Sequence, residues 1–454
     1  MTNDDSFAAT VKTRPLLVLS ALLLIVATAA AVPLVHPRDT WPFVTAFLLH
    51  GLIYLIAILL VLRRPGGWGT VAIILITAVG LRAVSMTALP DLTTDALRYV
   101  WDGRLGWEGV SPYLYPPAGE RLAHLRDSEI YPGINQKETA VTIYPPMAQL
   151  VFMAGVAIYD GIGGMKAIMF AFELVILLGL IGWLRSEELP ISRVAIYAWH
   201  PLPIWEFSSQ AHIDAAATGF LVLGIWAAVC RRQGLTGVLF AGAALVKYFP
   251  LVLLPALWRR WDWKLPVALF ASMGLLYLPY VPTAGTGVFG FLGKHLDNEG
   301  YQSGWGFHVI WYLRDFQLAD PPGWLYAIAA LLTILTLAAF SVFVRQADAF
   351  HPKRMVLLGA AFVFLISPHY PWYFAFLCAL MVRVAHPALF VMTLFCVTLY
   401  LPRIDGVSWS ELYAVTYVLP LVVWIGWEVA CRMRPEIAEL DNRLTPRPDP
   451  AKTL

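Results

Sequence analysis

Two clusters of ionisable residues stand out in a sequence that is otherwise strongly apolar. The first is a run of acids, Asp91, Asp95 and Asp102, which follows an apolar segment that carries Arg82. A positioned carboxylate can act as a general base towards a hydroxyl group, and a nearby cation can neutralise a departing phosphate. Asp95 and Asp91 are therefore candidate catalytic bases, and Arg82 is a candidate phosphate ligand. The alternatives are an arginine that snorkels or pairs with Asp91, and acids that are only solvated.

The second cluster places Glu206, His212 and Asp214 within nine residues of one another. Three titratable groups this close together in an apolar part of the chain are costly, and such groups are typical of a functional site. Lys247 follows in the next apolar segment, and an ammonium group there suits the oxygens of a phosphate. We predict that the first three residues orient a substrate and that Lys247 binds the donor phosphate. The simpler alternative is that polar side chains join neighbouring helices.

A third group of polar and aromatic residues lies between Ser367 and Tyr373 and includes His369. Tyr and Trp collect at membrane interfaces in many proteins, so an interfacial belt and a sugar or polyprenyl contact both fit this segment. The sequence contains no Gly-rich phosphate loop, dinucleotide fingerprint or HExxH motif. We therefore expect a sugar donor that is a lipid rather than a nucleotide.

The elements that must position these residues are membrane helices. Of the 454 residues, 59% are hydrophobic and 14% are charged, and the charges are bunched between long apolar runs. One helical crossing of a bilayer takes roughly 20 apolar residues, and windows of this length recur along the chain. The runs are continuous rather than alternating, which favours helices over a barrel. The predicted fold is an all-α polytopic membrane protein with about 11–13 transmembrane or half-crossing helices.

The distribution of Lys and Arg predicts the topology. Lys12, Arg14 and the pair Arg63–Arg64 favour a cytoplasmic N-terminus and a third span that ends outside. Two long polar stretches then become external loops, and loops of this length usually carry function. We predict one transmembrane domain over residues 1–431, followed by a cytoplasmic tail, 432–454. Within the domain, residues 89–145 form a first external loop that holds the acidic site, and residues 282–322 form a second external loop.

A short hairpin is expected between Arg231–Arg232 and Arg259–Arg260. Both basic pairs favour the cytoplasmic side, yet only about 25 residues separate them, so a single crossing cannot satisfy both. Pro250 removes a backbone donor and breaks a helix. We predict two short helices with a break near Lys247–Pro250, whose apex points outward.

The order of these motifs resembles the integral-membrane glycosyltransferases of the GT-C fold. The resemblance is to bacterial polyprenol-phosphate-mannose-dependent mannosyltransferases and, more distantly, to eukaryotic GPI mannosyltransferase I. It covers about residues 80–380. The motifs that carry it are Asp95 sixteen residues before Ser111-Pro112-Tyr113, then Tyr144-Pro145-Pro146, His200-Pro201-Leu202-Pro203 with Ser208-Ser209 and Asp214, Lys247-Tyr248-Phe249-Pro250, and His369-Tyr370-Pro371-Trp372-Tyr373.

The resemblance implies a catalytic or metal-binding acid in the first external loop, a polyprenyl-phosphate sugar donor and inversion at the anomeric carbon. Asp95 takes the acid's place, and Tyr113 and His369 become expected substrate contacts. The eukaryotic relatives have Asp-x-Asp at this position, whereas this chain has Thr93-Thr94-Asp95. Because the first acid is missing, a divalent cation such as Mg²⁺ or Mn²⁺ and a metal-free site that uses Arg and Lys both stay open.

The sequence thus predicts a glycosyltransferase of the bacterial inner membrane, with both termini cytoplasmic and an external active site. Its expected partners are a polyprenyl-phosphate donor of a hexose (mannose), a glycolipid or glycan acceptor, and the lipid bilayer. The net charge of +2 says little about partners in a membrane protein, and nucleic acid is not expected among them. The main alternative is a transporter or flippase for a lipid-linked sugar, which would predict matching halves with interrupted helices. A structural membrane protein would not need the clustered ionisable residues.

Overall fold

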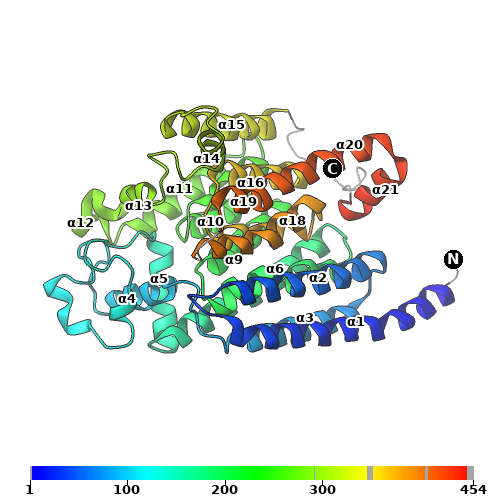
Figure 1. Cartoon of the computed structure of the whole chain (residues 1–454), viewed down its shortest axis with the longest axis horizontal. Helices are drawn as coiled ribbons and strands as arrows, with labels where there is room; N and C mark the ends of the chain where they lie inside the picture. The colour runs from blue at the N-terminus through cyan, green and yellow to red at the C-terminus, as the bar shows by residue number, and fades with distance from the viewer. Residues whose placement is uncertain (1–2, 291, 345–350, 404–406, 447–454) are drawn as a thin grey trace. The chain divides into compact units, whose positions relative to one another are not determined.

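A computed structural model describes residues 3–290, 292–344, 351–403 and 407–446, and every regular element in these ranges is a helix (Figure 1). The last eight residues of the predicted tail, 447–454, lie outside the described residues. In lipid a helix satisfies its own backbone hydrogen bonds, which is why long apolar runs fold this way. The predicted all-α polytopic fold class is confirmed.

Among the described residues, six helical segments are long and apolar enough to cross a membrane: Pro15–Leu34, Trp41–Arg63, Trp68–Ser85, Ile162–Ser186, Gly323–Phe343 and Trp409–Met433. A seventh crossing would be the pair Lys264–Tyr277 and Val281–Phe289, which is bent by 61°. The described part of the chain also contains five shorter apolar helices: Pro146–Ile158, Asp214–Val229, Gln233–Ala244, Pro371–Met381 and Pro387–Leu401. The protein is therefore a multi-pass integral membrane protein.

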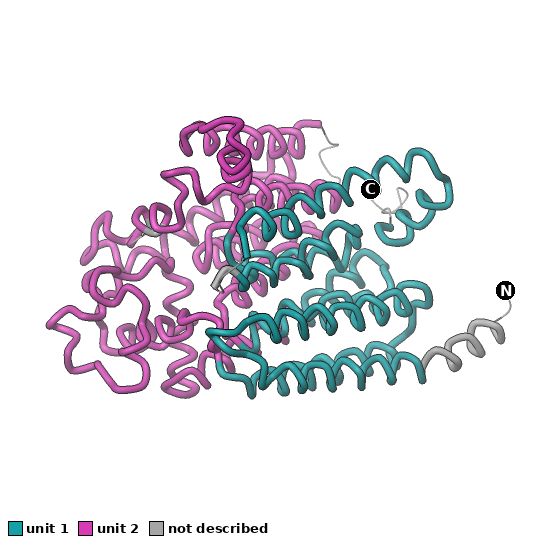
Figure 2. Tube along the Cα trace, in the orientation of Figure 1, with its two compact units in different colours: residues 1–89, 177–209, 369–454 teal, residues 90–176, 210–368 magenta. Residues whose placement is uncertain are grey.

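The chain divides into two compact units, which are shown in teal and magenta in Figure 2. Unit 1 comprises residues 1–89, 177–209 and 369–454. The long helix α6 (Ile162–Ser186) passes from unit 2 into unit 1 at residue 177. The other α-helices of unit 1 are α1 (Asn3–Ala31), α2 (Trp41–Arg63), α3 (Trp68–Ser85), α7 (Ala195–Ala198), α8 (Pro201–Pro203), α17 (Ala375–Met381), α18 (Pro387–Phe395), α19 (Trp409–Tyr413), α20 (Leu419–Met433) and α21 (Pro435–Leu444). The predicted single membrane domain stays a prediction.

Unit 2 comprises residues 90–176 and 210–368 and contains both predicted external loops. Its α-helices are α4 (Asp95–Trp107), α5 (Pro146–Ile158), α9 (Asp214–Val229), α10 (Gln233–Ala244), α11 (Lys264–Tyr277), α12 (Val281–Ala284), α13 (Leu292–Asn298), α14 (His308–Asp315), α15 (Gly323–Phe343) and α16 (Pro352–Ile366). The first predicted loop is thus largely folded, with α4 followed by two 3₁₀ turns at Glu120–Leu125 and Tyr131–Gly133.

Glycine allows the closest helix contacts of unit 2. Helices α4 and α5 lie side by side (Figure 1), and a Cβ atom on Gly103 of α4 would come within 2.5 Å of the carbonyl oxygen of Phe152 in α5. A Cβ atom on Gly237 of α10 would likewise collide with the backbone of α11 at Leu265. Small residues let helix backbones approach where lipid gives no hydrophobic drive for association. Gly103 therefore fixes α4, and the acid at its start, against the bundle.

The predicted break near Lys247–Pro250 is confirmed. Helix α10 ends at Ala244, and a 3₁₀ helix occupies Phe249–Ala256. Pro250 lacks the backbone N–H that an α-helix would need at its position, and Lys247 lies between the two helical segments. The lysine is thereby held at a helix break rather than inside a span.

Candidate active site

Asp95 is the first residue of α4 and is half-buried. The N-terminus of a helix favours negative charge, because its first backbone N–H groups have no partner within the helix. The hydroxyl group of Tyr99, one turn further on, lies 3.5 Å from Oδ2 of Asp95. Asp95 also lines a small cavity of about 90 Å³ together with Arg98 and Tyr144. The predicted base is therefore placed beside an open space.

Lys247 and Asp214 form a close ion pair in unit 2. Nζ of Lys247 lies 2.7 Å from Oδ2 of Asp214, and their side chains are 15% and 2% exposed. Asp214 opens helix α9, as Asp95 opens α4. Its other carboxylate oxygen, Oδ1, is buried and has no hydrogen-bond partner among the described residues. A paired lysine and an acid with an unused oxygen can together receive a charged, hydroxylated substrate.

The segment that carries His212 is tied to the residues just before Asp95. Nε2 of His212 lies 3.2 Å from Oγ1 of Thr93, and the backbone N–H of Leu92 donates to Oε1 of Gln210 at 3.1 Å. Both sides of these contacts belong to unit 2. The structure thus brings together the first acidic run and part of the second cluster, although about 120 residues separate them.

The phenol of Tyr99 interacts electrostatically with both Asp95 and Asp214. Burial raises its pKa most, and the charges of Asp95 and Asp214 raise it further, together with Tyr144. The Tyr99 hydroxyl is 3.5 Å from that of Tyr144, and its ring stacks on Phe152 at 4.6 Å. Tyr99 therefore stays protonated and interacts electrostatically with both helix-terminal carboxylates.

Asp91, the other candidate base, has a different environment. Its carboxylate interacts electrostatically with Lys166, a lysine of α6 that is only 7% exposed. A buried ammonium needs a counter-charge, and Asp91 supplies one. Of the two candidate bases, Asp91 interacts electrostatically with a buried cation, whereas Asp95 borders a cavity and a phenol.

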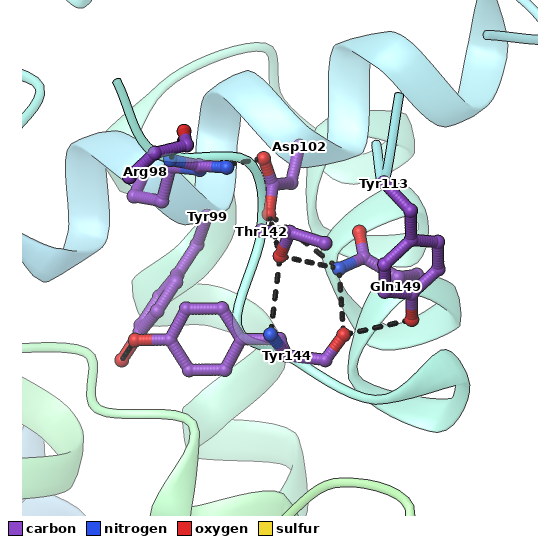
Figure 3. Close-up of polar contacts among 8 residues, drawn as sticks. Arg98, Tyr99, Asp102, Tyr113, Thr142, Tyr144 and Gln149 are labelled. Atoms are coloured by element: carbon purple, nitrogen blue, oxygen red, sulfur yellow. Dashed lines mark hydrogen bonds and ion pairs between the residues drawn. The ribbon is translucent and has the colours of Figure 1, made fainter. Parts of the chain in front are cut away.

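Asp102 is a buried acid whose hydrogen bonds organise the segment before Tyr144 (Figure 3). It is 1% exposed and accepts hydrogen bonds from Nε of Arg98 at 2.8 Å and from Oγ1 of Thr142 at 2.6 Å. Nε2 of Gln149 donates to Oγ1 of Thr142 at 3.0 Å and to Oδ2 of Asp102 at 3.4 Å. This network holds α4, α5 and the segment before Tyr144 together.

Tyr113 belongs to the same network. Its hydroxyl donates to the carbonyl oxygen of Tyr144 at 2.8 Å, and Nε2 of Gln149 donates to that carbonyl at 3.3 Å (Figure 3). The ring of Tyr113 packs edge-on against Tyr280 at 5.3 Å, and burial raises the pKa of its phenol above the usual value. The described contacts of Tyr113 are therefore structural, and its expected role as a substrate contact stays a prediction.

The remaining predicted site residues, Arg82, Glu206 and His369, belong to unit 1. Arg82 is fully buried, and its Nη1 donates to the carbonyl oxygens of Ala198 at 2.7 Å and Ala78 at 3.2 Å. Glu206 is fully buried in the π-helical turn Ile204–Ser209. Its two carboxylate oxygens accept from the Tyr400 hydroxyl at 3.0 and 2.9 Å. The described contacts of both residues lie within unit 1.

His369 is half-exposed and sits among aromatic rings of unit 1. Its imidazole centroid lies 5.5 Å from the ring of Trp409 and 6.4 Å from that of Tyr413. Aromatic walls of this kind suit sugar rings as well as membrane interfaces, so both interpretations of the segment still fit.

Sequence reasoning missed Lys166 and Gln149. Lys166 could have been noticed as a lysine inside an apolar run, where charge is expensive. Gln149 is the single amide in the apolar helix α5, but only the folded structure connects it to Asp102. Among the described residues no group of three or more His, Cys, Asp or Glu side chains could hold a metal ion.

Helix-terminal acids, a paired lysine and a cavity within apolar helices define a multi-pass membrane protein with a candidate group-transfer site. The family model of glycosyltransferase family 87 matches residues 142–368, which is half of the chain. The chain belongs to glycosyltransferase family 87. Neither the comparison with curated proteins nor that with solved structures finds a match. The predicted membrane glycosyltransferase is confirmed at this level, and the matched range includes His212, Asp214 and Lys247.

Proposed function

We propose that this glycosyltransferase transfers the hexose mannose from a polyprenyl-phosphate donor to a hydroxyl group of an acceptor at the outer face of the membrane. The observation that supports this most is the arrangement in unit 2. Asp95 begins α4 next to the segment of His212, and the nearby Asp214 is paired with Lys247 at 2.7 Å. A base and a cation are the two groups that the reaction requires.

In the proposed reaction Asp95 takes the proton of the acceptor hydroxyl. The hydroxyl oxygen then attacks the anomeric carbon of the donor sugar while the bond from that carbon to the phosphate oxygen breaks. The electron pair of this bond leaves with the polyprenyl phosphate. One displacement from the opposite face inverts the anomeric carbon. Asp91 is the second candidate base, but its interaction with Lys166 favours a positioning role.

Lys247 stabilises the phosphate as negative charge develops on it, and Arg82 is the second proposed phosphate ligand. Asp214 has an unused carboxylate oxygen that can accept a hydrogen bond from a sugar hydroxyl. His212 is assigned to orienting the same sugar. Further substrate contacts are assigned to Glu206, His369 and Tyr113.

The proposed orientation follows from the basic residues near the ends of the chain and of the early spans. Lys12, Arg14 and the Arg63–Arg64 pair favour a cytoplasmic N-terminus in a bacterial inner membrane. The charged C-terminal tail, residues 432–454, is assigned to the cytoplasmic side as well. The acids of α4 then belong to the outer side, where a lipid-linked donor can reach them by lateral diffusion.

The test uses the purified full-length protein in membranes with radiolabelled polyprenyl-phosphate mannose. Label is followed into lipid-extractable and polymeric fractions for the wild type and for Asp95→Ala. Glu120→Ala is the matched control, because Glu120 is an exposed acid of the same loop. We expect transfer by the wild type and by the control, and none by Asp95→Ala, at equal amounts of folded protein.

Two results would contradict the proposal. Undiminished transfer by Asp95→Ala would show that Asp95 is not the catalytic base. Movement of the donor across the bilayer without transfer of label would support a flippase instead.

A further inference from the structure

Unit 2 contains a second, larger cavity of about 780 Å³, which shares no lining residue with the small cavity beside Asp95. Pockets of this size hold ligands larger than a single sugar ring. Its lining comes from the end of α4, the following loop, α5 and the end of α11. The residues that matter for the argument are Ser111, Arg121, Gln149, Leu150, Leu275 and Leu276.

The walls of this cavity are apolar and belong to membrane helices. Leu150 comes from α5, a short apolar helix, and Leu275 and Leu276 come from α11, part of the bent candidate span. The side chains of Leu150 and Leu275 are 44% and 68% exposed. Exposed aliphatic groups on a membrane helix face hydrocarbon rather than water. A hydrocarbon chain can therefore lie along this side of the cavity.

Two buried polar atoms of residues that line the cavity have no hydrogen-bond partner among the described residues. Gln149 is 2% exposed, and its Oε1 is buried with no hydrogen-bond partner among the described residues. The amide orientation is fixed, because Nε2 donates to Thr142, Asp102 and the carbonyl of Tyr144. Oγ of Ser111 is also buried without a partner in the described part of the chain. A hydroxyl group on a ligand would satisfy both atoms.

Arg121 gives the rim of the cavity its charge. Among the described residues that line the cavity it is the one charged side chain. Its Nη1 donates to the hydroxyl of Tyr115 at 2.8 Å, and its guanidinium lies 5.3 Å from the centre of that ring. The side chain is thus held in place, and it attracts an anion such as a phosphate.

We propose that this cavity binds a lipid with a hydroxylated, anionic headgroup. The chain lies along Leu150, Leu275 and Leu276, a headgroup hydroxyl donates to Oε1 of Gln149, and the phosphate meets Arg121. This lipid site does not rest on the proposed function, because Asp95 does not line the cavity. The donor is assigned elsewhere, because Lys247 does not line this cavity.

The test measures lipid binding without any sugar transfer. Full-length protein in nanodiscs is irradiated with phosphatidylglycerol that carries a diazirine in one acyl chain, and labelled peptides are identified by mass spectrometry. Phosphatidic acid with the same diazirine chain has a phosphate but no hydroxyl, and serves as the comparison. We expect phosphatidylglycerol to label α5 and the end of α11 preferentially.

Two variants and one control locate the site. Leu150→Trp fills the cavity from a half-exposed position and should reduce labelling roughly tenfold, as steric overfilling does. Ser111→Ala breaks no described hydrogen bond of the protein, and should reduce the preference for phosphatidylglycerol over phosphatidic acid. Val267→Trp is the control, since Val267 is a 64% exposed residue of α11 outside the cavity. Its labelling should equal that of the wild type.

Equal labelling by the two lipids, or wild-type labelling of Leu150→Trp, would overturn the lipid site. Competition by unlabelled undecaprenyl phosphate would assign the cavity to the chain of the donor instead. If the labelling is as expected but no label moves from radiolabelled donor, the proposed function fails while the lipid site stands.

Discussion

Each of the two units contains a cluster of buried charges, and the clusters are satisfied in different ways. In unit 1, Arg383 contacts Glu187 at 2.9 Å and donates to the carbonyl of Pro446 at 2.6 Å. Arg193 donates to carbonyls that include that of Leu444 at 2.7 Å. Arg383 is 1% exposed and Arg193 is 4% exposed. In the described part of the chain, every buried side-chain nitrogen of these two arginines has a hydrogen-bond partner.

The cluster of unit 2 is less complete. Asp214 pairs with Lys247 through one oxygen and leaves the other unpaired, and Asp95 borders a cavity at the start of a helix. A buried polar atom without a partner costs stability, so a folded protein retains it where a ligand will use it. The comparison suggests that Arg383 and Arg193 hold unit 1 together, whereas the Lys247–Asp214 pair of unit 2 receives a substrate.

The largest expected effect is on the candidate base. Asp95→Asn should lower kcat by roughly 10²- to 10⁴-fold, because the amide cannot accept the acceptor's proton. Asp91→Asn should have a smaller effect, since Asp91 interacts with Lys166 rather than facing the cavity. Transfer rates at saturating donor, with equal folded protein, check both variants. A larger loss of transfer rate in Asp91→Asn than in Asp95→Asn would make Asp91 the base and Asp95 the positioning residue.

Lys247→Met should reduce transfer by roughly 10²- to 10³-fold, because the leaving phosphate loses its cation. The single variant also leaves Asp214 buried and unpaired, so its thermal stability should fall. The double variant Lys247→Met/Asp214→Asn removes that charge, and should regain stability but not activity. Recovery of transfer in the double variant would mean that the pair is structural, like the arginines of unit 1.

Arg383→Met should affect stability rather than transfer. The substitution leaves the carboxylate of Glu187 with fewer hydrogen-bond donors. Removing one partner of a buried ion pair lowers the free energy of unfolding by roughly 3–5 kcal/mol. Thermal unfolding in detergent should show the loss, while the rate per folded molecule at low temperature stays at the wild-type level. A fall in that rate without loss of stability would break the contrast between the two units.

A smaller effect is expected from Asp127, which anchors the first predicted loop. Burial raises its pKa, but the hydrogen bonds from Arg104 and from the N–H groups of Ile130 and Tyr131 outweigh this and lower the pKa to about 2. A lowered pKa in the folded state adds stability above the unfolded value of 3.8, and this stability is lost as pH falls through about 2. Asp127→Asn should therefore increase loop proteolysis at pH 7. The difference from wild type should shrink at pH 3, and a constant difference would contradict this explanation.

The smallest expected effect is that of metal removal. No set of ligands gathers among the described residues, and Lys247 already supplies positive charge. EDTA should therefore leave the transfer rate unchanged, and added Mg²⁺ or Mn²⁺ should not raise it. A rate that falls with EDTA and returns with one of these cations would establish the divalent-cation alternative.

Much of this fold was predictable because its signals are local. The length of an apolar run determines whether a segment can cross a membrane, and Pro250 interrupts a helix wherever the chain leads. The acid Asp95 was also noticeable from its neighbours, because several carboxylates follow directly after an apolar run. Membrane class, the break after Lys247 and the candidate base therefore came from the sequence alone.

The partners of these residues were decided by tertiary structure. Lys247 and Asp214 are 33 residues apart and meet because two helices end near each other. The interaction of Asp91 with Lys166, and the burial of Oε1 of Gln149 beside a cavity, have no periodic signal in the chain. Hydropathy records the solvent that each segment prefers, but which side chains face one another depends on how helices pack, and that is a property of the whole fold.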